Sequence, residues 1–344
     1  MLFRSHIRAT YLLRPEHALA QARQSEARWQ RGEPQGLLDG VPVTIKENIA
    51  TQGDPTPLGT AAVPLVPAAA DAPPAARLRE AGAVMVAKTT MPDYGMLSSG
   101  LSSFHPLSRN PWDVSKGPGG SSAGGGAAAA AGYGPLHIGT DIGGSLRLPA
   151  SWCGIFSLKP SLGRIPIDPP YTGRAAGPMT RTVQDAALMM QVLSQPDARD
   201  SMSLPYQPIA WGEYDQGVQR LRGLHLGLLL DAGCGLPVDD EVRAAVEHAA
   251  RLFEQAGAQV SLMQPFMTQA MLDGMDHFWR MRSYTDLQAL PEAQRAKVLP
   301  YIRAWAESAA GMTGPQVFQA SQQFHTTRVA TVKACSGFDY VLSP

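Results

Sequence analysis

Residues 117–154 constrain the fold more than any other part of the sequence, because they hold twelve glycines together with Ser121, Ser122 and Ser145. Such a composition is common in flexible linkers. Here, however, the tract continues into the alanine run 127–131, which favours a helix, and then into a strand-like segment at 137–140. We therefore predict an ordered glycine-rich loop rather than a linker.

The common motifs for phosphate and metal binding are missing from the sequence. It contains neither G-x-x-x-x-G-K-[ST] nor G-x-G-x-x-G, so a nucleotide site is not indicated. Its eight histidines include no H-E-x-x-H, which leaves metal catalysis unsupported. The three cysteines, Cys153, Cys234 and Cys335, are far apart and form no C-x-x-C pair. This pattern predicts buried thiols rather than disulfides or a zinc site.

Charge and hydropathy bear on the cellular location of the protein and on its partners. The 29 basic and 29 acidic side chains balance, and no run of lysine or arginine exists, so nucleic acid is not an expected partner. No apolar run approaches the ~18 residues that a membrane span requires. Residues 1–13 are interrupted by Arg4, His6 and Arg8, whereas a signal peptide needs an unbroken apolar stretch. We expect a cytoplasmic protein with no membrane partner, which could form a homo-oligomer.

Helix-like and strand-like segments alternate along the chain, which is typical of α/β proteins. Helices are predicted at 15–30, 74–81 and 239–255, with Gly82 as the stop of the second and Asp239 as the cap of the third. Strands are predicted at 41–45, 83–87, 224–230 and 258–263. Residues 266–335 are predicted to be mostly helical and to form a cover over one face. No internal repeat and no linker divides the chain, so one domain over 1–344 is the preferred organisation.

One known nucleophile motif occurs in the glycine-rich tract. Residues 120–124 satisfy G-x-S-x-G with Ser122 as nucleophile, and the histidines that could act as its base are His225, His248, His277 and His325. Such an elbow follows a buried strand, but residues 109–118 are polar and interrupted by proline. The context therefore disfavours this interpretation.

A stronger pattern joins Lys46, Ser121 and Ser145, which lie 75 and 24 residues apart. Taken singly, each has an ordinary interpretation, as a solvated lysine at a strand end or a serine in a turn. Segments around these three residues and elsewhere match one known family with few breaks from about Ala18 to Asp197. They are 41–49, 87–95, 110–113, 118–125, 139–149 and 153–166. Together they resemble the amidase signature family, whose serine hydrolases use a Ser-Ser-Lys triad. The resemblance is thinner from Ser201 onward.

The resemblance implies a role for each matching residue. Ser145 falls on the family's nucleophile, Ser121 on the serine that relays the proton, and Lys46 on the base, while Ser122 matches a hydroxyl that helps to hold the lysine. The oxyanion hole falls on the backbone amides of Ile142, Gly143, Gly144 and Ser145. In the family, the relaying serine follows a cis peptide bond. The supporting pair Asp141 and Arg147 could equally be an ion pair that ties the loop.

These residue types suit the chemistry. A lysine can remove a proton from serine only when burial or neighbouring donors lower its pKa enough to leave the amine neutral. The flanking Ile45 and Ile49 are consistent with a buried Lys46. Consecutive glycines before the nucleophile allow several amides to converge on one oxyanion. Ala123, Gly125 and Gly126 depart from the family pattern, which puts the detailed loop geometry in doubt.

The fold that the resemblance implies is a mixed, mostly parallel β-sheet core wrapped by helices, with a catalytic core at about 18–197 and the helical cover at about 266–335. The implied reaction is hydrolysis of a small-molecule carboxylic amide, without a cofactor. One alternative is the A subunit of the glutamyl-tRNA amidotransferase, although 167–176 does not look like that subunit's corresponding segment. The other is an inactive scaffold, since the chain stops after 339–344 and begins later than family members usually do, so that the C-terminal part of the family domain is expected to be absent.

Overall fold

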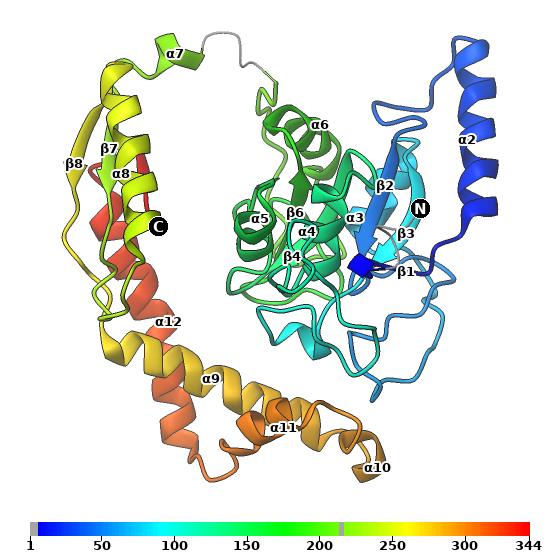
Figure 1. Ribbon diagram of the computed structural model, residues 1–344. Coiled ribbons are helices and arrows are strands. Elements are labelled where there is room, and N and C mark those ends of the chain that lie inside the picture. Colours follow the sequence, from blue (N-terminus) through cyan, green and yellow to red (C-terminus); the bar gives the residue numbers. More distant parts are fainter. Residues whose placement is uncertain (1–5, 213–216) are drawn as a thin grey trace. The chain divides into compact units, whose positions relative to one another are not determined.

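The computed structural model describes residues 6–212 and 217–344 (Figure 1). The chain divides into two compact units, the first made of 1–212 and 291–302 and the second of 213–290 and 303–344. The predicted catalytic core, 18–197, falls within the first unit. The organisation of 1–344 as one domain with a helical cover stays a prediction.

A six-stranded sheet forms the centre of the first unit, in the order β1-β3-β2-β4-β6-β5. Its strands are β1 (Thr10–Tyr11), β2 (Pro42–Lys46), β3 (Val84–Thr89), β4 (Leu136–Asp141), β5 (Phe156–Ser157) and β6 (Ala175–Thr180). The central strand β2 runs parallel to both β3 and β4, whereas β1, β5 and β6 pair in the antiparallel sense. The β2 strand includes Lys46, which sequence analysis placed just outside it, because Lys46 continues the β2–β3 ladder opposite Thr89.

Helices cover this sheet, and a continuous apolar core lies beneath α3 and α6. The helices are α2 (Pro15–Gln30), α3 (Pro73–Glu80), the 3-10 turn η1 (Asp93–Gly95), α4 (Ala123–Ala130), α5 (Arg147–Cys153), α6 (Val183–Leu193) and α10 (Glu292–Arg295). The α3 helix ends at Glu80, one residue earlier than predicted. Gly82 follows the cap with a φ of +84°, which residues with a side chain rarely adopt. Thr182 caps α6 by accepting a hydrogen bond from the Asp185 amide at 3.1 Å.

The second unit holds a smaller sheet, β8-β7-β9, in which both pairings are parallel. Its elements are α7 (Gly217–Arg220), β7 (His225–Leu228), α8 (Asp240–Gln255), β8 (Gln259–Leu262), α9 (Gln269–Gln288), α12 (Gly314–Cys335) and β9 (Tyr340–Leu342), and α11 (Pro300–Glu307) spans the division between the units. Asp239 stands at the N-cap of α8, but its side chain makes no capping hydrogen bond. Residues 266–335 are mostly helical, as predicted.

Across the described residues, four of the seven strand pairings are parallel. The predicted fold class, a mixed and mostly parallel sheet with helices, is therefore confirmed. None of the helices in the described ranges is both long and apolar enough to cross a membrane.

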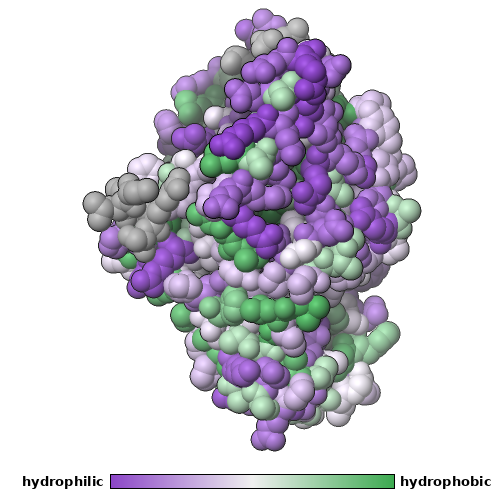
Figure 2. Space-filling view, turned by 90° about the vertical axis from the view of Figure 1, so that its right-hand side faces the viewer, coloured by the Kyte–Doolittle hydropathy of each residue, from purple (hydrophilic) through white to green (hydrophobic). Residues whose placement is uncertain are grey.

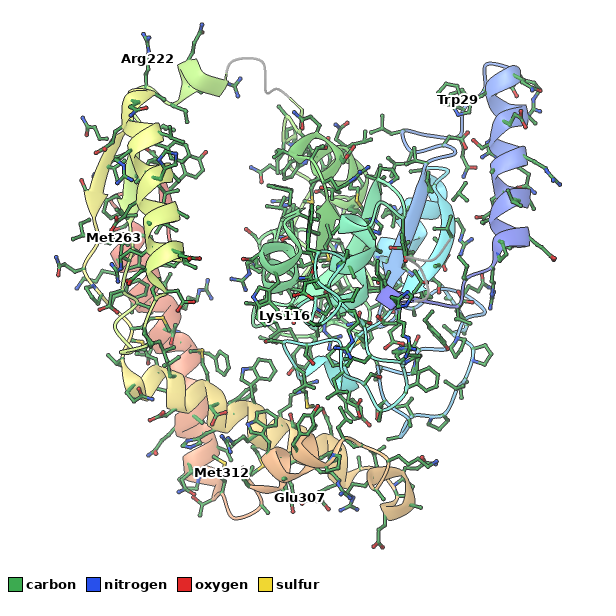
Figure 3. All side chains as sticks on the ribbon, viewed as in Figure 1. Trp29, Lys116, Arg222, Met263, Glu307 and Met312 are labelled. Carbon is green, nitrogen blue, oxygen red and sulfur yellow. The ribbon has the colours of Figure 1, made fainter. Side chains whose placement is uncertain are left out.

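Two further details concern the end of α2 and the cysteines. Trp29, at the end of α2, donates through Nε1 to the Asp39 carbonyl at 3.1 Å and so ties that end to the following loop (Figure 3). All three cysteines are free thiols, but only Cys153 is buried, and burial raises its pKa to about 12. Buried thiols were therefore correctly predicted for Cys153 and wrongly for Cys234 and Cys335, which are partly exposed.

Candidate active site

The side chain of Lys46 is fully buried at the carboxyl end of the central strand β2. Burial lowers its pKa to about 7, the positive charge of Arg174 acts in the same direction, and the carboxylates of Glu47 and Asp141 act against it. Desolvation penalises the ammonium form more than the neutral amine. Close to neutral pH, Lys46 is therefore divided between its charged and neutral forms.

Two serine hydroxyls lie next to the Lys46 amine. Its Nζ donates to Ser121 Oγ at 2.8 Å and to Ser122 Oγ at 3.0 Å. The Ser122 hydroxyl in turn donates to the Thr140 carbonyl at 3.1 Å, and it accepts a hydrogen bond from the Thr140 amide. Ser122 therefore links Lys46 to strand β4, which fits the supporting position that the sequence resemblance implied for it.

The glycine-rich loop approaches other backbone so closely that side chains are excluded. A Cβ atom at Gly120 would lie 2.5 Å from the Leu97 carbonyl oxygen and 2.5 Å from the Ser99 amide nitrogen. The following peptide bond, between Gly120 and Ser121, is cis, as it is in the family that the sequence resembles. These contacts bring Ser121 to Lys46 from 75 residues away.

The segment after β4 is organised around the buried carboxylate of Asp141. Its Oδ1 accepts from the Gly144 amide at 2.8 Å and from Arg147 Nη2 at 2.9 Å. Its Oδ2 accepts from the Leu146 amide and from Arg147 Nε, both at 3.0 Å. Burial raises the pKa of Asp141, but the bonds from Arg147, Leu146 and Gly144 together outweigh burial and hold that pKa below its ordinary value. The Asp141–Arg147 pair therefore shapes this loop.

The predicted oxyanion donors differ in their surroundings. Gly144 has a φ of +114°, and its amide is already engaged by Asp141. Gly143 is exposed, and a Cβ atom built on it would meet no atom within 4 Å. The space beside Gly143 is therefore open, and Ile142 is next to it in the chain.

Ser145 joins the group through its main chain. Its carbonyl accepts a hydrogen bond from the Ser122 amide at 3.1 Å, which places the two serine segments side by side. In the described part of the chain, the half-buried Ser145 hydroxyl has no hydrogen-bond partner of its own. The structure thus joins Lys46, Ser121 and Ser122 directly, and it brings Ser145 beside them through the backbone.

The alternative with Ser122 as a nucleophile at an elbow does not fit this geometry. No strand lies within residues 101–122, all of which the structure describes, whereas an elbow follows a buried strand. Ser122 is fully buried and its hydroxyl is engaged by Lys46 and Thr140. These contacts leave it poorly placed to attack a substrate.

Sequence reasoning missed three residues around the site. Asn48 donates to the Thr140 hydroxyl at 3.0 Å, Gly95 would bring a Cβ atom within 3.1 Å of Ser121 Oγ, and Arg174 adds positive charge near Lys46. Asn48 had a signal, since polar residues directly after a buried strand often line a site. The sequence holds no comparable signal for Arg174 and Gly95, because only the folded chain brings them to Lys46 and Ser121.

No metal-binding group emerges from the side chains. Among residues 6–212 and 217–344, no set of three or more His, Cys, Asp or Glu side chains could hold a metal ion. The expectation that the site uses neither metal nor cofactor stays a prediction.

The structure thus combines the mixed α/β fold with a buried lysine beside two serines, as the resemblance in the sequence implied. Comparison with known families agrees, since the Amidase family model matches residues 2–320. This chain belongs to the amidase signature family.

Curated relatives are identical to the chain at about a third of the aligned positions. It is 38% identical over 263 residues to the A subunit of the glutamyl-tRNA(Gln) amidotransferase from Alkaliphilus metalliredigens, covering 74% of this chain and 52% of the relative. It is 33% identical over 314 residues to the protein of that name from Heliobacterium modesticaldum, covering 85% of this chain and 64% of the relative. The chain thus spans about half the length of the first of these relatives.

Solved structures extend the similarity over nearly the whole chain. A bacterial aryl acylamidase of the amidase signature family superposes with a TM-score of 0.89 at 29% identity, covering 99% of this chain and 73% of the other. The native peptide amidase of Stenotrophomonas maltophilia gives a TM-score of 0.82 at 27% identity, covering 98% and 76%. These likenesses support an amidase-type enzyme.

Proposed function

We propose that the chain is an amidase that hydrolyses a carboxylic amide to an acid and ammonia or an amine, through a triad of Lys46, Ser121 and Ser145. The main support for this proposal is the 2.8 Å hydrogen bond between Lys46 Nζ and Ser121 Oγ. Burial lowers the pKa of this lysine to about 7. A neutral amine keeps two N–H donors and gains a lone pair. It can therefore donate to Ser122 and accept the proton of Ser121.

In the first half of the reaction, Ser121 passes its proton to the Lys46 amine and takes the proton of Ser145. The Ser145 oxygen then bonds to the amide carbon, and the carbonyl electron pair moves onto the oxygen. Backbone amides of Ile142 and Gly143 stabilise that charge, as preorganised donors do in other acyl transfers. We assign no such role to the Gly144 amide, since Asp141 already accepts its hydrogen bond.

In the second half, the carbon–nitrogen bond breaks and the leaving nitrogen receives the proton from Lys46 by way of Ser121. The carbonyl re-forms as an ester on Ser145. Water then attacks this ester, giving its proton to the same Ser121–Lys46 pair, and the acid departs with the proton returned to Ser145. The predicted location of this chemistry is the cytoplasm.

The second candidate is the activity of the glutamyl-tRNA amidotransferase A subunit, which frees ammonia from glutamine with the same triad. It is favoured by the 38% identity to a relative of that name. In that case the chain would work with other protein subunits. Residues 167–176, which do not look like the corresponding segment of that protein, favour the amidase instead.

Ammonia release from a panel of aliphatic amides, aromatic amides and glutamine separates the candidates. We expect turnover of aliphatic or aromatic amides that disappears in Ser145→Ala and persists in Ser151→Ala, a matched change at an exposed serine of α5. Turnover of glutamine alone would favour the amidotransferase. No turnover of any amide by the folded chain would favour the inactive scaffold.

A further inference from the structure

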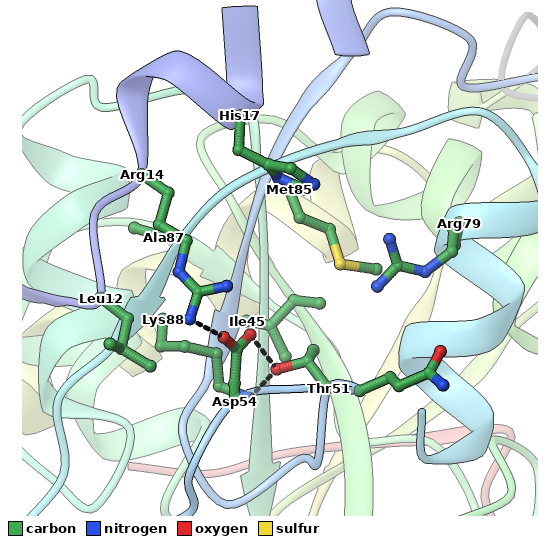
Figure 4. A pocket seen from close by; sticks show the side chains of 11 residues that line it. Leu12, Arg14, His17, Ile45, Thr51, Asp54, Arg79, Met85, Ala87 and Lys88 are labelled. Carbon is green, nitrogen blue, oxygen red and sulfur yellow. Dashed lines mark hydrogen bonds and ion pairs between the residues drawn. The ribbon is translucent and has the colours of Figure 1, made fainter. Parts of the chain in front are cut away.

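A cavity of about 290 Å³ lies in the first unit and takes no part in the proposed reaction. Ile45 lines it, whereas Lys46 is the next residue of the same strand and so points to the opposite face of the sheet. Figure 4 shows Arg14 and His17, from the start of α2, and Arg79, from α3, directed into the same space. The cavity therefore gathers cationic and polar groups away from the candidate active site.

The base of this cavity holds a second buried lysine, Lys88 of β3, which is only 3% exposed. Its Nζ donates to the Ile49 carbonyl and to Thr51 Oγ1, the latter at 3.0 Å. No carboxylate forms an ion pair with Lys88 in the described residues. An ammonium group buried without a direct counter-ion is costly unless an anion joins it.

Two arginines stand at the rim, each held by one carboxylate. Arg14 Nη2 lies 2.6 Å from Asp54 Oδ1, and Arg14 is 48% exposed. Arg79 donates to Asp71 through Nε at 2.7 Å and through Nη2 at 3.2 Å, so its Nη1 group lies outside both contacts. Three of the charged residues that line the cavity are thus cations, and one, Asp54, is a carboxylate. Burial lowers the pKa of Lys88 to about 8, and the carboxylates of Asp54, Glu47 and Asp71 act against it.

The remaining wall is apolar and comes from Leu12, Ile45 and Met85. The surface over the neighbouring helix α2 is mainly hydrophilic (Figure 2). A ligand that fits this cavity therefore needs one negative end for the cations and a short hydrocarbon body for the apolar wall. Inorganic phosphate lacks the hydrocarbon body, so it would leave the apolar wall uncovered.

We propose that this cavity is a binding site for a small organic monocarboxylate. The carboxylate lies between Lys88 and the Nη1 edge of Arg79 and accepts charge-assisted hydrogen bonds from both, while the hydrocarbon chain packs on Ile45 and Met85. This site does not depend on the proposed amidase activity, because binding can be measured without turnover.

Calorimetric titration of the full chain with butyrate tests this site, with 1-butanol as the uncharged ligand of similar size and inorganic phosphate as the bare anion. We expect saturable binding of butyrate and none of 1-butanol or phosphate. Arg79→Gln should weaken butyrate binding at least tenfold, or about 1.4 kcal/mol. Arg251→Gln, at an exposed arginine of α8 outside the cavity, should leave binding unchanged.

Circular dichroism checks that each variant is folded, and Arg79→Met, which also removes the guanidinium, replaces Arg79→Gln if the latter unfolds. Ser145→Ala should bind butyrate as the unchanged chain does, which separates this cavity from the candidate active site. The proposal is overturned by a flat titration, by phosphate binding as tightly as butyrate, or by unchanged butyrate affinity in the folded arginine variant.

Discussion

At the scale of single residues, the protonation state of Lys46 governs the proposed reaction. Its pKa is lowered from the ordinary value to about 7, chiefly by burial, and only the neutral amine can accept a proton. The neutral fraction grows as pH rises through that pKa. We therefore predict that the acylation rate rises along one ionisation centred near pH 7 and then levels off, as stopped-flow measurement of the first turnover can show.

Replacement of Lys46 distinguishes a base from a merely structural lysine. Arginine keeps the charge and approximate length, but its guanidinium does not lose a proton in proteins. Lys46→Arg should therefore be inactive between pH 6 and pH 10 while its circular dichroism stays native. An active, folded Lys46→Arg enzyme with the original pH profile would mean that another group is the base.

The residues of this site were predictable from the sequence only as a set. Lys46, Ser121 and Ser145 stood out because the segments around all three match one family together. The engagement of the Gly144 amide by Asp141 was not predictable, since it depends on how the loop folds back at 2.8 Å. The charge of Arg174 near Lys46 likewise arises only from tertiary folding.

At the scale of elements, helix α4 contains two neighbouring glycines with opposite tolerance for a side chain. A Cβ atom at Gly124 would lie 2.2 Å from the Ala9 carbonyl oxygen and 2.4 Å from the Thr90 amide nitrogen. At Gly125 the nearest atom is the flexible Met179 Sδ, at 3.0 Å. Alanine gains ~1 kcal/mol over glycine in a helix, which cannot offset a clash with backbone.

Gly124→Ala should therefore destabilise the chain by more than ~2 kcal/mol, and Gly125→Ala should lie within ~1 kcal/mol of the original. The free energy of unfolding from urea titration measures both. Equal stability of the two variants would show that α4 does not pack against the 9–10 and 89–90 segments as described.

The loop after β4 depends on the charge of one carboxylate. Asp141→Asn removes that charge. With an NH2 group in place of Oδ2, the side chain can no longer accept the hydrogen bonds of the Leu146 amide and Arg147 Nε. We predict a loss of roughly 2 kcal/mol in unfolding free energy and a lower kcat. Asp113→Asn, at an exposed loop aspartate, is the matched control and should stay within ~0.5 kcal/mol. An Asp141→Asn enzyme with the original kcat would show that the charge of Asp141 is not needed for the reaction.

The same carboxylate also contributes to acid sensitivity. Because the pKa of Asp141 is lower in the folded chain than its ordinary value, its contribution is complete above that ordinary value and is lost as pH falls through the folded pKa. The stability gap between the original chain and Asp141→Asn should therefore narrow in acid.

At the scale of the whole molecule, the alternation of helix and strand signals was enough to predict a mixed α/β fold. Strand ends were less predictable, since β2 extends to Lys46 and β3 to Thr89 through their mutual ladder rather than through local propensity. The division into two units could not be read from the sequence either, because no change in composition marks it.

Reaction with a fluorophosphonate, which modifies activated serines, tests the central claim most directly, with the modified residue located by peptide mass spectrometry. The account predicts a single adduct on Ser145 that fails to form in Lys46→Ala but forms normally in Ser151→Ala. An adduct on Ser122, or labelling of Ser145 at full rate without Lys46, would contradict it.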